Sequence, residues 1–191
     1  MGYPVDKKAQ IHSELALLTP RLASFAAALT GSEAAAHSLI KATRNQVLSR
    51  AAKERGHTPL IIWTLATMYG LWASRNKSTV SGDKHAPGDP RLFQPRGSLT
   101  GDDPAAATRM ARFVAQLTPQ QRGTLHLVYG ERFSYDEVAE IFAVPVGTVM
   151  TRLARAHAAF AERQDQSASA AVPAGAIKAA QEGPRGREWA A

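Results

Sequence analysis

Apolar residues in this chain recur three or four positions apart, the spacing that places side chains on one face of an α-helix. In the first part of the chain, this pattern and the helix start signals predict four helices. The first covers about residues 5–18, and capping hydroxyls at Thr19, Ser32 and Thr58 open the other three. The last of them, residues 60–76, is apolar nearly all round, so we expect it at the centre of a core.

Helix signals in the later part of the chain are sharper. Residues 104–117 have the apolar spacing of one amphipathic helix. Capping boxes that begin at Thr118 and Ser134 open two further helices, because in each a Gln or Glu follows three positions later. Pro145 then opens a last helix that runs to about Phe160. No segment has a strand pattern of useful length, so the sequence predicts an all-α protein.

Breaker residues divide the chain into parts. Residues 79–101 collect Gly, Pro, Ser and Asp without an apolar period, which is typical of a linker. Residues 163–191 are rich in Ala, Gly, Ser and Pro and have little to bury, so they are predicted to be a disordered tail. We therefore expect two small helical domains, residues 1–78 and 102–162, joined by a flexible linker.

The helix from Ser134 to Phe142, the turn at Ala143 and the helix from Pro145 have the spacing of a helix-turn-helix. The second of these helices has an apolar stripe that can pack on the first. The stripe consists of Val146, Val149, Leu153, Ala156 and Phe160. A DNA-binding domain or a plain helical hairpin would both fit this pattern.

The opposite face of that second helix carries Thr148, Thr151, Arg152 and Arg155. Short hydroxyls and long guanidinium groups suit phosphates and guanine edges in a major groove. The free amide groups at the start of the helix add an anion site. On this interpretation the face reads DNA, and the alternative is that its Arg side chains are only solvated.

The stretch FSYDEVAEIFAVPVGTVMTRLARA, residues 133–156, resembles the promoter −35-reading domain of the extracytoplasmic-function sigma factors, and LTPQQRGTLHLVYGE matches the helix before it. The N-terminal part is similar more weakly. There, LTPRLASFAAALTGS and the Trp63 helix ending in SRNKS resemble the family's core-binding, −10-reading domain. Together the two regions cover about residues 10–162.

The resemblance implies roles for individual residues. Thr151, Arg152 and Arg155, with Thr148 near the helix start, would face the −35 element, and Ser134 and Arg132 would lie near backbone phosphates. Met150 stands where some members have Arg, which changes the expected base preference. Ala143 replaces the family's usual turn Gly, at a cost of about 1 kcal/mol if that residue is left-handed.

The N-terminal region departs from the family on the helix after the LTG motif. The family typically carries an acidic run with a Gln there, which the polymerase clamp grasps. This chain instead has Ala35, His37, Ser38, Lys41 and Ala42, so the expected negative surface is missing. Whether this loss abolishes polymerase binding is open from sequence.

Charge is unevenly distributed over the chain, whose formal net charge is +7. Residues 1–78 hold 10 Lys and Arg against 4 Asp and Glu, whereas residues 102–162 hold 6 against 7. The basic potential therefore belongs to the region that would hold the opened −10 strand. Lys53, Arg55 and His57, between the third and fourth predicted helices, are the candidate contacts there.

Several function classes are excluded by what the sequence lacks. Without Cys the chain has no disulfides or thiolate metal sites, and its His residues never recur at helical ligand spacing, so we predict neither metal nor cofactor. No P-loop, nucleophile elbow or Rossmann fingerprint is present, so we predict no enzyme. The apolar run of residues 60–72 is too short to span a bilayer, and the N-terminus has no signal core, so we expect a cytoplasmic protein without a membrane association.

The resemblance as a whole implies a sigma factor that binds core RNA polymerase and promoter DNA, is covered by an anti-sigma protein, and is a monomer when free. Two alternatives stay open. One is a sigma-like regulator that binds an anti-sigma partner without initiating transcription, and the other is a stand-alone helix-turn-helix regulator. A dimerising regulator is less favoured, because residues 1–78 contain no heptad repeat.

Overall fold

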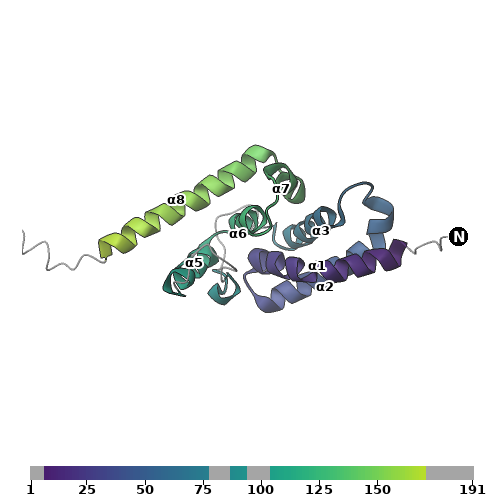
Figure 1. Cartoon of the computed structure of the whole chain (residues 1–191), viewed down its shortest axis with the longest axis horizontal. Helices are drawn as coiled ribbons and strands as arrows, with labels where there is room; N and C mark the ends of the chain where they lie inside the picture. Colours follow the sequence, from purple (N-terminus) through teal and green to yellow (C-terminus); the bar gives the residue numbers. More distant parts are fainter. Residues whose placement is uncertain (1–6, 78–86, 94–103, 171–191) are drawn as a thin grey trace, which may run out of the picture. The chain divides into compact units, whose positions relative to one another are not determined.

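The computed structural model describes residues 7–77, 87–93 and 104–170 (Figure 1). Within these ranges the secondary structure is helical, without strands, as the sequence predicts. The elements are, in chain order, α1 (Lys7–Thr30), α2 (Glu33–Glu54), α3 (Leu60–Arg75), the 3₁₀ turn η1 (Pro90–Phe93), α5 (Pro104–Gln116), α6 (Pro119–Leu125), the π-helical turn η2 (His126–Gly130), α7 (Tyr135–Phe142) and α8 (Val146–Ala170).

The first helix differs from the prediction, because the expected break at Thr19 is wrong. α1 runs without interruption through Pro20, and the Thr19 hydroxyl donates back to the Leu15 carbonyl at 3.1 Å instead of capping a new helix. Pro20 lies on the exposed side, where the carbonyl that loses its amide partner can be hydrated. Leu15 and Leu22 on the other side are fully buried, so continuing the helix keeps both in the core.

The predicted helix starts are confirmed, with a side-chain cap, where both partners of a capping box are present. Thr118 and Ser134 each accept a hydrogen bond from the backbone amide of the residue three positions later, and that residue's side chain accepts from the cap's own amide. Ser32 lies at the start of α2 in an extended conformation, but its side chain makes no cap bond. The N-cap position of α3 is Pro59, one residue after the predicted Thr58.

One apolar core extends through both helical regions. It contains buried side chains of α1, α2, α3, η2, α7 and α8, with Phe25, Leu65, Leu127 and Phe142 almost completely enclosed. Residues up to Ala156 form one compact unit, and a second unit begins at His157, within α8. The predicted domain boundaries at residues 78, 101 and 162 stay predictions, whereas the shared core is a finding of the structure.

Part of the predicted linker packs on this compact unit. The amide of Gly88 donates to the Ala115 carbonyl at 2.8 Å, and the amide of Asp89 donates to the Gly31 carbonyl at 2.9 Å. Gly88 is buried, so residues 87–93 join the end of α1 to the end of α5. The first part of the predicted disordered tail, residues 163–170, is helical and continues α8, so the prediction is wrong there. The other residues of the predicted linker, and the tail from residue 171 on, lie outside the described ranges.

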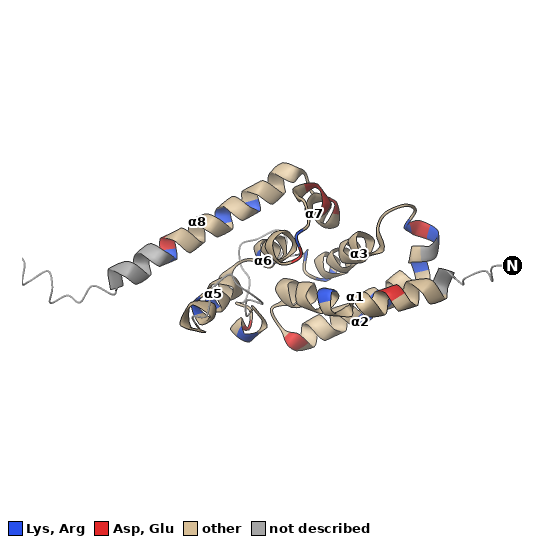
Figure 2. Ribbon diagram, viewed as in Figure 1, with Lys and Arg blue, Asp and Glu red and all other residues tan. Residues whose placement is uncertain are grey.

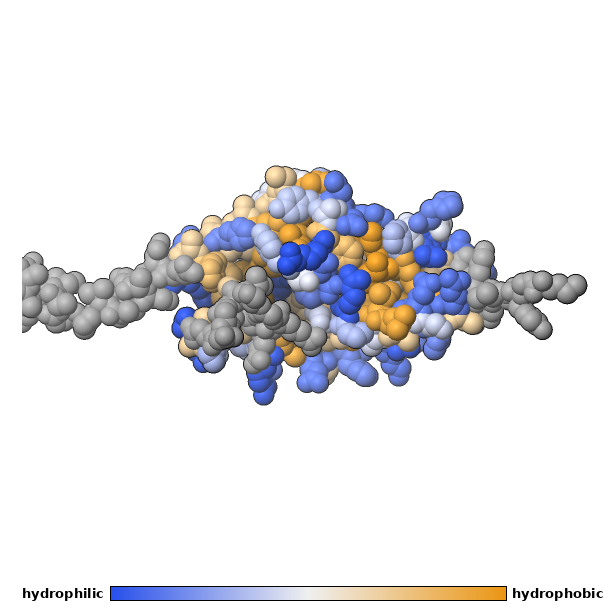
Figure 3. Space-filling view, in the orientation of Figure 1, coloured by the Kyte–Doolittle hydropathy of each residue, from blue (hydrophilic) through white to orange (hydrophobic). Residues whose placement is uncertain are grey.

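The surface of the described residues is mixed, and in the orientation of Figure 3 its apolar area gathers around α3. Ile61, Trp63, Leu71 and Ala73 of this helix are partly buried and pack against the core. Tyr69 and Trp72 are buried, as expected for core residues. None of the described helices is both long and apolar enough to cross a membrane.

Candidate nucleic-acid interface

The helix-turn-helix consists of α7, the turn at Ala143–Val144, and α8. Ala143 is left-handed, with φ 51° and ψ 48°, so the position that the family fills with Gly does require that conformation. The amide of Val144 donates to the Ala139 carbonyl at 3.1 Å and closes the end of α7. The predicted turn is confirmed, with an alanine that carries the strain.

The predicted apolar stripe holds the two helices together. Val149, Leu153 and Ala156 of α8 are buried, and so are the four apolar residues that α7 was expected to contribute. These four are Val138, Ala139, Ile141 and Phe142. The polar face of α8 is thereby directed away from the core.

The structure brings the four predicted −35 contacts to one face of α8. Thr151 and Arg155 are exposed, and Thr148 is half-buried near the helix start. The Thr151 hydroxyl donates to the Gly147 carbonyl at 2.8 Å, which leaves its lone pairs available to a ligand. Met150 is 55% exposed beside them and could contact a thymine methyl group.

Arg152 differs from its neighbours on this face. Its guanidinium carbon lies 5.1 Å from the centre of the Phe142 ring, and one of its terminal nitrogens is buried without a hydrogen-bond partner in the described structure. The aromatic ring holds the side chain in place through a cation–π contact. Arg152 is therefore fixed against α7, whereas Arg155 extends freely.

Charge in the helix-turn-helix differs between its two helices, α7 and α8. Figure 2 shows basic bands along α8 and acidic ones on α7. Asp136 and Glu137 stand in the first turn of α7, where the helix dipole favours carboxylates. The Ser134 hydroxyl is engaged in its capping box. Arg132 is exposed, in a left-handed conformation with φ 62°, and presents its charge to solvent.

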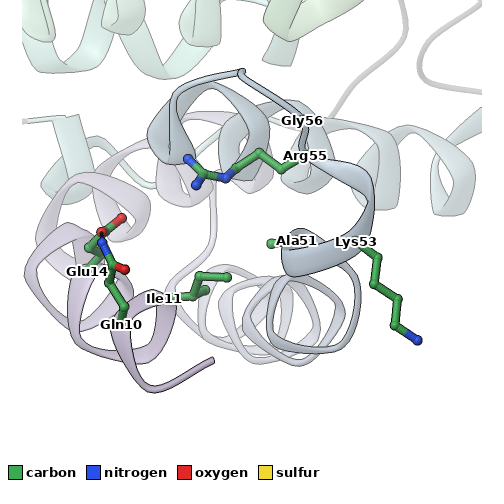
Figure 4. A pocket seen from close by; sticks show the side chains of 7 residues that line it. All are labelled: Gln10, Ile11, Glu14, Ala51, Lys53, Arg55 and Gly56. Atoms are coloured by element: carbon green, nitrogen blue, oxygen red, sulfur yellow. Dashed lines mark hydrogen bonds between the residues drawn. The ribbon is translucent and has the colours of Figure 1, made fainter. Parts of the chain in front are cut away.

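Two of the three predicted −10 contacts, Lys53 and Arg55, line a hollow of about 230 Å³ between the start of α1 and the end of α2 (Figure 4). Arg55 extends over it and donates to the Thr58 carbonyl at 3.1 Å, whereas Lys53 points away into solvent. His57 is exposed in the adjoining loop and does not line the hollow. Glu14 also lines the hollow, so the charge of its wall is mixed.

The polymerase-facing surface expected on α2 is exposed and carries no acidic side chain at its centre. The two carboxylates of α2, Glu33 and Glu54, stand at its ends. Between them Ala35, His37, Ser38 and Lys41 are exposed and Ala42 is half-buried.

Arg122 is the most important residue that the sequence analysis missed. It is 2% exposed, and its guanidinium donates to the Ala28 carbonyl at 2.8 Å and to the Ala115 and Leu117 carbonyls at 3.2 and 2.7 Å. These carbonyls lie at the ends of α1 and α5, where acceptors lack helical partners and a cation is favourable. Burial lowers the pKa of Arg122 to about 10, so it stays charged at neutral pH.

A second missed cluster lies where α1 meets η2. Arg21 forms an ion pair with Glu131 and lies over the Phe133 ring, with 5.4 Å between its guanidinium carbon and the ring centre. His126 stacks on Phe25 and lies 3.6 Å from the other carboxylate oxygen of Glu131. Burial lowers the pKa of His126, an effect that Glu131 opposes, so the imidazole is neutral at pH 7. No sequence signal connects Arg21 with Glu131, because they are far apart in the chain.

The site can be compared with known proteins once this geometry is established. Residues 108–159 match the family model of sigma-70 region 4. The C-terminal part of the chain is a sigma-70 region 4 domain. The matched range contains the helix-turn-helix with all four residues of its reading face. No curated protein matches the chain significantly.

Two solved structures have the same fold. The sigma factor RpoE of Bartonella quintana, in complex with the anti-sigma factor NepR, is similar with a TM-score of 0.59 and 20% identity over 80% of this chain and 95% of that chain. The anti-anti-sigma factor PhyR of Bartonella quintana, also complexed with NepR, has a TM-score of 0.54 and 16% identity over 80% of this chain and 51% of that chain. The region 4 match supports the prediction of a sigma factor for the C-terminal part of the chain, and the two solved structures show a shared fold.

The described residues of the protein contain no group of three or more His, Asp or Glu side chains that could hold a metal ion. The polar face of α8 is made of hydroxyl and guanidinium groups. Groups of this kind suit phosphates and base edges.

Proposed function

We propose that this sigma factor binds core RNA polymerase and directs it to promoters with −35 and −10 elements. The observation that carries the proposal is the exposed polar face of α8 on a region 4 domain, with Thr151 and Arg155 open to a ligand. The chain would have no chemistry of its own, because polymerase supplies it. We also propose that it acts in the cytoplasm and is a monomer when free.

In this mechanism α8 enters the major groove of the −35 element. Arg155 has the reach and the planar fork to pair with the O6 and N7 acceptors of a guanine, while Thr148 and Thr151 contact base edges or phosphates nearby. Arg152, held by Phe142, offers a charge at a fixed position. Arg132 would contact the backbone, and Ser134 would position α7 through its cap.

The opened −10 strand is assigned to the basic N-terminal region. Lys53 and His57 are exposed and free to contact phosphates, whereas Arg55 is oriented by its bond to the Thr58 carbonyl. The hollow beneath Arg55 lies beside these three residues. An anti-sigma partner is proposed as well, by analogy with the RpoE structure, which contains one.

A second candidate function is a sigma-like protein that binds an anti-sigma partner and does not initiate transcription. One observation favours it: the exposed middle of α2 has no carboxylate with which to engage a basic clamp on polymerase. The fold is also shared with PhyR, an anti-anti-sigma factor complexed with NepR. The retained polar face of α8 favours the first candidate, because a decoy has no use for it.

The Arg155→Ala substitution tests the DNA-reading assignment. We expect affinity for a −35 duplex, obtained by in vitro selection with the native protein, to fall by about 1 to 3 kcal/mol, or roughly 5- to 150-fold, if Arg155 reads a base. Fluorescence anisotropy at fixed salt measures it. Arg112→Ala removes the same charge from the exposed side of α5 and should change affinity little. Equal losses in the two variants would contradict the assignment.

A further inference from the structure

The start of α8 carries no charged side chain. Residues 146–151 have the sequence VGTVMT, and the first charged residue of the helix is Arg152. Figure 2 shows this stretch of α8 without charge and basic bands further along the helix. In helix-turn-helix proteins, the N-terminal residues of the second helix are the ones that contact base edges. In this chain those contacts therefore fall to neutral side chains.

Met150 is the large apolar side chain of this stretch that faces solvent. It is 55% exposed, whereas Val149 before it is fully buried and Val146 packs against the core. Single exposed apolar side chains are common on protein surfaces, so exposure alone assigns no role. The position of Met150 adds to it, because the residue lies next to the exposed Thr151 on the side of α8 that turns away from the buried stripe.

The helical neighbours of Met150 on the exposed side are small. Side chains three and four positions apart lie next to each other on a helix, so these neighbours are Gly147 and Ala154. Both residues are exposed, and a Cβ on Gly147 would meet nothing within 4 Å. No long side chain of α8 therefore covers Met150, and the backbone around it can approach the floor of a groove closely.

The two arginines of the polar face leave Met150 with a surface of its own. Arg152 is held against α7, with its guanidinium carbon 5.1 Å from the centre of the Phe142 ring. Residues two positions apart do not face each other on a helix, so Arg152 is directed away from Met150. Arg155 is exposed more than one turn further along. The face of α8 is thus apolar near its start and cationic beyond it.

We propose that Met150 is a specificity-determining residue of the −35 contact and that it selects a thymine through the 5-methyl group of the base. The inference rests on the proposed function, because it requires α8 to lie in the major groove. Thymine presents a methyl group in that groove, whereas guanine and cytosine present polar atoms that a thioether cannot pair with. The unbranched, polarizable side chain of methionine adapts its shape to such an apolar contact.

Replacing thymine with deoxyuridine tests this contact, because deoxyuridine pairs with adenine in the same way and lacks only the methyl group. A duplex is first obtained by in vitro selection with the native full chain, and each of its thymines is then replaced in turn. Fluorescence anisotropy at fixed salt gives the Kd for the native protein and for Met150→Ala. Met110→Ala is the matched control, because Met110 is a half-buried methionine on α5, outside the helix-turn-helix. Circular dichroism verifies that each variant keeps its helix content.

We expect the native protein to bind about three- to fivefold more weakly when one particular thymine loses its methyl group, as is usual for one buried methyl contact. Met150→Ala should bind the selected duplex more weakly by a similar factor and should no longer distinguish thymine from deoxyuridine at that position. Met110→Ala should behave like the native protein. A new selection with Met150→Arg should place a G·C pair there, because a guanidinium pairs with guanine.

Equal affinity of the native protein for the thymine duplex and for every deoxyuridine duplex would overturn the proposal. So would full discrimination in Met150→Ala, which would assign the methyl contact to a threonine of the same face, or an unchanged base preference in Met150→Arg. A selected site without any A·T pair would also overturn it. If the native protein selects and binds no duplex, the proposed function fails together with this inference, whereas binding without discrimination removes only the role of Met150.

Discussion

Replacing Arg122 with alanine is expected to lower the free energy of unfolding by about 3 to 5 kcal/mol, because hydrogen bonds to a buried charged group contribute about 1.5 to 3 kcal/mol each. The substitution leaves the carbonyls of Ala28, Ala115 and Leu117 without their donor in a closed environment. It also removes the cation that complements the C-terminal ends of α1 and α5. Urea denaturation followed by circular dichroism measures the loss.

Two further variants separate the causes of that loss. Arg122→Lys keeps the charge but not the planar fork, so it should recover part of the stability. Arg112→Ala removes an exposed Arg from the neighbouring helix and should change stability by less than about 0.5 kcal/mol. If Arg122→Ala were no more destabilising than Arg112→Ala, the capping role assigned to Arg122 would be wrong.

Replacing Phe142 with alanine is expected to cost about 3 to 5 kcal/mol, the usual range for a large buried aromatic side chain. The ring contacts Phe25 and Tyr69 in the N-terminal region and supports Arg152 on the reading face. A cavity there removes packing from the N-terminal helices and from α8 at once. Thermal unfolding monitored by circular dichroism measures this effect.

A second aromatic residue on the same helix provides the control. Tyr135 is 42% exposed at the start of α7, so Tyr135→Ala should have little effect on stability. A similar loss in both variants would show that α7 is generally intolerant to substitution. In that case Phe142 would not be the central contact between the two regions.

Local signals in the sequence were sufficient for the helix-turn-helix. The capping boxes at Thr118 and Ser134 join residues only three positions apart, and the apolar stripe of α8 follows the helical period. The left-handed turn at Ala143 could be expected from the glycine that the family places there. These features depend on neighbours in the chain, so a pattern is enough to find them.

Features that depend on tertiary packing could not be predicted in the same way. Pro20 normally favours a break, but burial on the opposite side of α1 outweighs the lost hydrogen bond. The partners of Arg122 lie at the ends of α1 and α5 and are backbone carbonyls, which carry no sequence signature. The packed segment at Gly88 resembles an ordinary linker by composition, because glycine is typical of both flexible and closely packed backbone.

The reading face lies between these two cases. Its position on α8 follows from the helical period, and Thr151 and Arg155 are exposed as expected. The contact of Arg152 with Phe142 was not expected, because it depends on how far the side chain bends toward α7. Residue identity therefore predicts which side chains can contact DNA, and the packing determines which of them are free to move.

Binding to core RNA polymerase is the central claim and can be measured most directly by size-exclusion chromatography. The purified chain is mixed with core polymerase at moderate salt, and a sigma factor that has the acidic run serves as the positive control. The account predicts that the chain elutes with polymerase despite the missing carboxylates on α2. Elution of the chain alone, while the control binds, would contradict the proposed function and favour the sigma-like regulator.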